Sequence, residues 1–162
     1  MLEYLENSAF SEWARGESLW GWPFALTVHA WGTAIVIGFI FIFGLRLLGF
    51  FRTIPLTSLS RLTPVVWVAV FLQVCSGFTL WMTKPSKYIT DGAFLIKFTL
   101  VCIGVVVTWF YFSMLRRESL EWEAKGAISK RGYRFVAVTV AVWAGVLVAG
   151  RLTAYLGQLY AQ

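Results

Sequence analysis

The sequence has few of the residue types that hold metal ions or form catalytic clusters. It contains one histidine among 162 residues, and its eight acidic residues are outnumbered by fourteen basic ones. Cys75 and Cys102 stand singly within apolar runs, without CxxC or CxxCH spacing, which excludes a c-type haem attachment motif and gives no basis for a disulfide framework. The scarcity of carboxylates and imidazoles excludes a dinuclear metal centre in a helical bundle. The glycines show no phosphate-loop order.

The chain is instead rich in apolar side chains. Its composition is 59% hydrophobic, with nine Trp and fourteen Phe, which leaves too little polar surface to cover a soluble globule. A net charge of +6 would suggest nucleic acid for a soluble protein, but here the basic residues fall mainly between apolar runs, where they act as topology signals and headgroup contacts. We therefore expect a lipid bilayer, and not nucleic acid, as the partner.

Four apolar runs are each long enough to cross a bilayer as a helix. They predict an all-α integral membrane protein with a single transmembrane domain over residues 1–162, in which four transmembrane helices form a bundle. The predicted spans are about residues 24–51, 62–82, 93–115 and 135–159.

Residues 1–22 have a different pattern. Leu5, Ala9 and Trp13 recur at a spacing of four, which is typical of one face of a helix. Gly21 and Pro23 follow and interrupt this pattern. The segment predicts a short amphipathic helix that lies at the membrane interface.

Basic residues in the short loops indicate the orientation. One side of the membrane has eight of them, namely Arg52, Arg61, Arg116, Arg117, Lys125, Lys130, Arg131 and Arg134. The other side has three, namely Arg15, Lys84 and Lys87. We therefore expect a multi-pass protein of the bacterial inner (cytoplasmic) membrane with both termini in the periplasm.

Small residues recur every four positions in the first and fourth predicted spans, a pattern that lets helix backbones approach closely in lipid. These residues are Ala30, Ala34 and Gly38 in one span and Ala141, Gly145 and Ala149 in the other. They could pack within the bundle or between two copies, so a homo-oligomer and a larger membrane complex both remain open.

Ionisable groups inside hydrocarbon are costly and often functional. His29, Lys97 and Arg151 come from three different spans, and the rise of a helix places them at similar depths in the outer leaflet. Tyr155 extends the polar stripe of Arg151, and Gln73 offers a hydrogen-bonding group from the second span. Because no carboxylate shares that depth, we expect an anionic molecule to join the two cations.

Haem b suits this set, with His29 as the metal ligand on iron, and Lys97 and Arg151 as partners of the propionates. Gln73 and Tyr155 would complete the cofactor-binding residues. A quinone or a lipid headgroup presents similar chemistry. In the plainer alternatives, His29 hydrogen-bonds a neighbouring helix, while Lys97 and Arg151 extend to the headgroups.

Four stretches carry a family resemblance: SLWGWPFALTVHAWGTAIVIG, GLRLLGF, DGAFLIKFTLV and WAGVLVAGRLTAYL. They resemble those of an uncharacterised family of small bacterial four-helix inner-membrane proteins. More distantly, the early His29 and the later Lys97 are similar to residues of HemJ-type protoporphyrinogen oxidases, a resemblance that implies porphyrin binding.

The same two positions also resemble the CopD-type copper-resistance membrane domain. Three hypotheses follow. The first is binding of haem b for electron transfer or porphyrin redox chemistry. The second is transport of copper or of a small solute. The third is an accessory role in a larger membrane complex.

Overall fold

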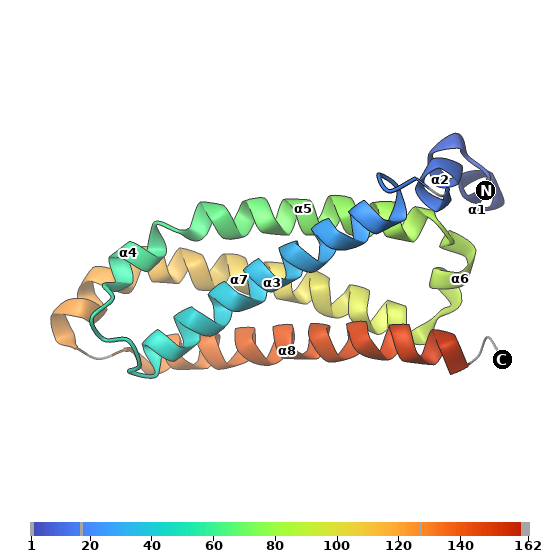
Figure 1. Ribbon diagram of the computed structural model, residues 1–162. Coiled ribbons are helices and arrows are strands. Elements are labelled where there is room, and N and C mark those ends of the chain that lie inside the picture. Colours follow the sequence, from blue (N-terminus) through green and yellow to red (C-terminus); the bar gives the residue numbers. More distant parts are fainter. Residues whose placement is uncertain (1, 17, 127, 160–162) are drawn as a thin grey trace.

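The computed structural model describes residues 2–16, 18–126 and 128–159, and every regular element in this part of the chain is a helix (Figure 1). The elements are α1 (Leu2–Glu6), α2 (Ala9–Arg15), α3 (Trp22–Leu47), α4 (Leu56–Ser60), α5 (Thr63–Met82), α6 (Pro85–Thr90), α7 (Gly92–Lys125) and α8 (Lys130–Leu159). Four segments are long and apolar enough to cross a membrane: α3, α5 with the preceding α4, α7, and α8. The predicted all-α membrane protein with four spanning helices is confirmed.

Local sequence explains where the long helices begin and end. Proline occupies the first turn of both α3 and α5, where its missing N–H is not needed. Asp91 precedes α7, and its carboxylate accepts a hydrogen bond from the Ala93 amide at 2.9 Å. Gly126 ends α7 in the left-handed conformation, with φ at 62°, which is the usual helix-terminating glycine.

Some boundaries differ from those expected. Helix α3 ends at Leu47, and the following loop uses left-handed backbone at Gly49 (φ 97°) and Phe51 (φ 52°), which a helix to residue 51 would not allow. Helices α7 and α8 continue past the predicted spans to Lys125 and from Lys130. The hydrophobic length of a segment sets the span, whereas these polar extensions follow helix propensity and contacts outside it.

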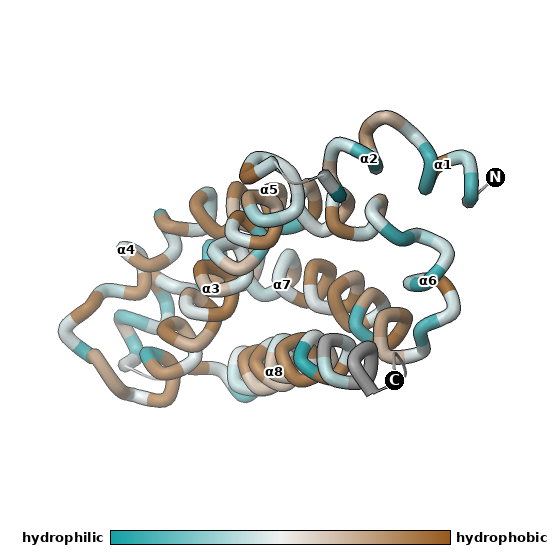
Figure 2. Tube along the Cα trace, turned by 45° about the vertical axis from the view of Figure 1, so that its right-hand side comes forward, coloured by the Kyte–Doolittle hydropathy of each residue, from teal (hydrophilic) through white to brown (hydrophobic). Residues whose placement is uncertain are grey.

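The N-terminal segment contains two short helices instead of one. Ser8 separates them, and its hydroxyl accepts a hydrogen bond from the Ser11 amide at 3.3 Å as the cap of α2. The fully buried Ser11 side chain donates to the Met82 carbonyl at 2.8 Å. This bond fixes α2 on the end of α5, so the segment packs on the bundle. Figure 2 shows hydrophilic residues gathered in α1 and α6, while the long helices are largely hydrophobic.

The bundle consists of two closely packed helix pairs, α3 with α5 and α7 with α8. Helix α3 crosses the bundle obliquely (Figure 1). Its first half lies on α5, where Gly32 approaches Ala69 and Gln73, and its second half reaches α8, where Gly44 faces Val140. The crossing angle therefore makes α3 the link between the two pairs.

The apolar core occupies the half of the bundle nearest α4. Phe43 packs against Phe112 with ring centroids 5.6 Å apart, and the buried Trp143 indole donates to the Thr108 hydroxyl at 2.9 Å. In contrast, none of residues 92–103 of α7 is buried, and its first buried position is Gly104. The end of the bundle that carries α1, α2 and α6 is consequently less tightly closed.

The expected small-residue stripe on the first span does not pack inside the bundle. Ala30 and Ala34 are exposed, and a Cβ added at Gly38 would meet nothing within 4 Å. Gly32, which lies outside that stripe, makes the close contact with α5. On α8, Ala149 is buried, whereas Ala141 of the same stripe is exposed.

Candidate functional site

His29 is half-buried on the face of α3 that lies against α5. Its Nδ1 atom lies 3.2 Å from the Ser76 hydroxyl, and its Nε2 atom lies 3.3 Å from the side-chain amide nitrogen of Gln73. A Cβ at Gly77 would come within 3.1 Å of the ring carbon Cε1. The absence of a side chain at Gly77 therefore provides the space in which the imidazole packs.

The surrounding hydrogen bonds assign the tautomer of His29. The Ser76 hydroxyl donates to the Leu72 carbonyl at 2.7 Å, so it accepts from Nδ1–H. The Gln73 amide group donates to Nε2 and to the Thr33 hydroxyl oxygen, the latter at 2.6 Å, while the Thr33 hydroxyl donates to the His29 carbonyl at 2.8 Å. The network fits a neutral imidazole with its lone pair on Nε2.

Gln73 is the central polar residue of this network. Its side chain is 7% exposed, and its Oε1 atom has no hydrogen-bond partner among the residues that the structure describes. That oxygen faces Gly32, where an added Cβ would lie only 2.7 Å away. A buried amide oxygen left without a partner is costly, which makes the Gln73 side chain the least satisfied part of the site.

Lys97 reaches the same end of the bundle from the other helix pair. It is half-buried on α7 and packs against Gly150 of α8, where an added Cβ would lie 3.6 Å from Cε and 3.8 Å from Nζ. Lys97 is the sixth residue of α7 and His29 the eighth residue of α3, and both helices begin at this end of the bundle (Figure 1). Across the described ranges, no carboxylate lies within ion-pair distance of Lys97. An imidazole on α3 and a cation on α7 that has no ion pair among the described residues therefore lie at the same end of the bundle.

Arg151 and Tyr155 have a different environment. Arg151 is exposed, and the Tyr155 side chain is 63% exposed. Successive residues of a helix are turned by about 100°, so Gly150 rather than Arg151 is the α8 residue that faces Lys97. Of the predicted site residues, the structure brings His29 and Gln73 together, places Lys97 at the same end of the bundle on the other helix pair, and puts Arg151 and Tyr155 on the exposed surface.

Sequence reasoning missed the contribution of Thr33. A signal for it was present, because Thr33 follows His29 by four residues and such pairs share one face of a helix. Ser76 follows Gln73 by three residues and lies on one face of α5 in the same way. The polar pair of His29 and Thr33 on α3 and the pair of Gln73 and Ser76 on α5 therefore indicate where the two helices are hydrogen-bonded.

Among the described residues, the donors that copper(I) prefers are spread over different helices. Within the described part of the chain, no three or more His, Cys, Asp or Glu residues form a group that could hold a metal ion. Cys75 and Cys102 are both exposed, and Met82 and Met114 are buried on different helices. Copper(I) prefers several thiolate, thioether or imidazole ligands, so this arrangement gives no support to copper transport.

The fold defines the class of protein, an all-α, multi-pass membrane protein with four spanning helices. Comparisons with family models, with curated proteins and with solved structures give no match to this chain. The resemblance to the HemJ and CopD groups therefore remains a hypothesis.

Proposed function

We propose that this protein binds an anionic, largely apolar molecule between the pair α3 and α5 and the pair α7 and α8, with haem b as the first candidate. The observation that carries the proposal is that half-buried His29 and Lys97 lie near the starts of α3 and α7, which belong to different helix pairs. They lie at the end of the bundle where residues 92–103 contribute no buried side chain. An imidazole and an unpaired cation in a membrane suit a ligand that supplies negative charge.

The donor set of His29 is compatible with a role as the residue that would hold haem iron. Metal-ligating histidines usually donate their second ring N–H to a nearby acceptor, and the Nδ1 to Ser76 bond at 3.2 Å provides this arrangement. Nε2 would be the ligating atom once the Gln73 amide turns aside. The unsatisfied Oε1 of Gln73 favours such a rearrangement, because the present position leaves part of that amide without a partner.

Lys97 would neutralise a carboxylate of the bound molecule, and the surrounding apolar side chains would exclude water from its body. Haem b, when bound, supplies one-electron redox chemistry whose potential depends on the axial ligand and on burial. A quinone offers carbonyl oxygens to the same ammonium, and to the imidazole in its other tautomer, in which Nε2 carries the proton. Arg151 and Tyr155 are exposed, so the proposal depends on His29, Lys97 and Gln73.

We also propose that the protein lies in the bacterial inner membrane with both termini in the periplasm. The distribution of basic residues supports this orientation. Helix α1 and the last turns of α8 lie at the same end of the bundle (Figure 1), as an even number of crossings requires. The binding site would then lie in the periplasmic half of the membrane.

Absorption spectroscopy of the protein purified from haem-replete cells tests the haem proposal. We expect a Soret band that His29→Ala abolishes and that Lys97→Gln weakens. Cys75→Ala is a matched control, because Cys75 is exposed on α5 next to Ser76, and it should leave the band unchanged.

The haem proposal would be contradicted if the wild-type protein, after haem is added in detergent and unbound haem is removed, shows no Soret band. Solvent extracts of the same preparation then test the quinone alternative, which predicts a quinone in the wild type that is lost in His29→Ala. If neither molecule is present, the binding proposal fails. Large partners that co-purify irrespective of His29 would instead support the accessory-subunit hypothesis.

A further inference from the structure

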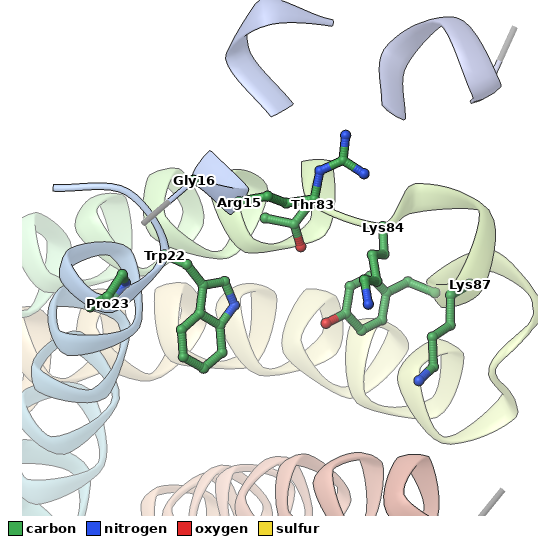
Figure 3. Close-up of a pocket in the computed structure, with 8 residues that line it drawn as sticks. Arg15, Gly16, Trp22, Pro23, Thr83, Lys84 and Lys87 are labelled. Carbon is green, nitrogen blue, oxygen red and sulfur yellow. The ribbon is translucent and has the colours of Figure 1, made fainter. Parts of the chain in front are cut away.

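A second polar feature lies at the same end of the bundle, at the start of the span that holds His29. It is a pocket of about 450 Å³ formed by the end of α2, the start of α3 and the connection from α5 into α6 (Figure 3). The lining residues are Arg15, Gly16, Trp22, Pro23, Thr83, Lys84, Lys87 and Tyr88. Neither the haem proposal nor the packing of the bundle uses this pocket.

The walls of the pocket are held in place by tertiary contacts. The buried Ser11 to Met82 hydrogen bond fixes α2 on α5. Gly21 lies so close to α2 that an added Cβ would be 2.8 Å from the Trp13 carbonyl oxygen. Ser86 of α6 donates to the Glu6 carboxylate at 2.7 Å, which ties α1 to α6. The basic side chains are therefore presented by a preformed frame.

The pocket carries more positive than negative charge. Lys84 and Lys87 are exposed and form no ion pair within the described residues. Two acidic residues lie nearby, and both have other partners: Glu6 contacts Arg15 at 4.0 Å and Ser86, and Asp91 caps α7. Two lysines are thus left to bind an anion.

Two aromatic residues with polar ends complete the lining. Trp22 is 44% exposed, and Tyr88 is half-buried with its ring centroid 5.1 Å from that of Phe94. Burial and the negative charge of Asp91 raise the pKa of Tyr88 above its ordinary value, so its hydroxyl remains a hydrogen-bond donor at neutral pH. Trp and Tyr at the ends of spanning helices mark the headgroup level of a membrane.

We infer that this pocket binds the phosphate group of an anionic phospholipid in the leaflet that holds His29. Lys84 and Lys87 bind the phosphate oxygens, while Trp22 and Tyr88 contact the boundary between headgroup and acyl chains. The position favours a lipid over a free anion, because α3 begins, α5 ends and α7 begins at this level, and their exposed apolar side chains continue into the hydrocarbon. This inference does not depend on the proposed haem site.

Native mass spectrometry of the full-length protein in neutral detergent measures the lipid preference. We expect phosphatidylglycerol to bind more tightly than phosphatidylcholine with the same acyl chains. The double variant Lys84→Gln with Lys87→Gln should reduce that preference about thirtyfold, since each of the two basic residues near an anionic headgroup contributes about 1 kcal/mol. The charge-conserving variant Lys84→Arg with Lys87→Arg should retain it.

Hydrogen exchange locates the binding. Phosphatidylglycerol should protect the amides of residues 83–90 in the wild type and not in the Lys84→Gln, Lys87→Gln variant. A matched control replaces two exposed basic residues at the start of α8, Lys130→Gln with Arg134→Gln, and should keep the protection of residues 83–90.

Three results would each overturn the inference. They are equal binding of the two lipids, equal protection of residues 83–90 in wild type and the glutamine variant, and displacement of phosphatidylglycerol by inorganic phosphate at equal concentration. The last would identify a site for free anions. The glutamine variant should have the same absorption spectrum as the wild type, with or without a Soret band. Failure of the lipid inference and failure of the haem proposal are therefore distinguishable.

Discussion

At the scale of single residues, close packing and hydrogen bonding of His29 and Gln73 join α3 to α5. In hydrocarbon, polar side chains have no water to bind and so find partners on neighbouring helices. Gly32 and Gly77 provide the space for these side chains. A Cβ at Gly32 would lie 2.7 Å from Gln73 Oε1, and a Cβ at Gly77 would lie 3.1 Å from His29 Cε1. The polar network thus depends on glycines that carry no chemistry themselves.

Gly32→Ala should therefore destabilise the protein. The new methyl group would press on Gln73 Oε1 and lie 3.2 Å from the Ala69 carbonyl, and Gln73 cannot move without breaking its bonds to His29 and Thr33. We expect a loss of about 1–3 kcal/mol in the free energy of unfolding, measured by denaturation in mixed detergent micelles.

Gly38→Ala is the matched control on the same helix. A Cβ there meets nothing within 4 Å, and alanine favours helix over glycine by up to about 1 kcal/mol. We expect unchanged or slightly increased stability. Equal losses in the two variants would show that Gly32 has no special packing role.

At the scale of elements, the polar extension of α7 has a structural role at the end of the bundle away from the N-terminal helices. The Glu123 carboxylate accepts hydrogen bonds from the Thr57 amide at 3.3 Å and its hydroxyl at 3.4 Å, which caps α4 from another helix. Trp122 is 4% exposed and packs into the core with Leu56 and Leu59 of α4. The extension of α7 therefore covers α4, the short helix in the connection from α3 to α5, and closes this end of the bundle.

Trp122→Ala tests this closure. Loss of a buried Trp side chain typically costs about 3–5 kcal/mol, and we expect a loss of that size together with faster hydrogen exchange in α4. Leu120→Ala, at a position 72% exposed, should change stability by less than about 0.5 kcal/mol. Unchanged exchange in α4 of the Trp122 variant would contradict the closing role of α7.

At the scale of the whole molecule, the two ends of the bundle differ. One end has a packed core with Phe43, Tyr111, Phe112 and Trp143 at less than 2% exposure, and the other has the half-buried His29 and Lys97 beneath the basic pocket. Both proposed ligands bind at the second end. The proposed orientation would place that end on the periplasmic side.

Reporter fusions test this orientation. Alkaline phosphatase joined to the C-terminus should be active, because that enzyme folds in the periplasm, while a fluorescent protein joined there through the Sec route should stay dark. The same reporters inserted after Gly126, between α7 and α8, should give the opposite pattern. The reverse result at both positions would overturn the proposed orientation and place His29 in the cytoplasmic leaflet.

The sequence by itself determined the four spanning helices and the all-α class, because a run of about 20 apolar residues is stable in lipid only with its backbone bonds satisfied within a helix. It also predicts comparable depths for His29, Lys97 and Arg151, since the helical rise relates position along a helix to depth. It did not determine the directions of their side chains, which depend on how each helix is rotated against its neighbours.

Only the tertiary structure decided those rotations. The oblique crossing of α3 on α5 turned His29 towards Gln73 and Ser76, and the packing of α7 on α8 turned Gly150 towards Lys97 and left Arg151 exposed. The physical reason is that close backbone contact at small residues sets how helices pack in a membrane. Depth follows from position along one helix, whereas a shared site requires the right faces of several helices to meet.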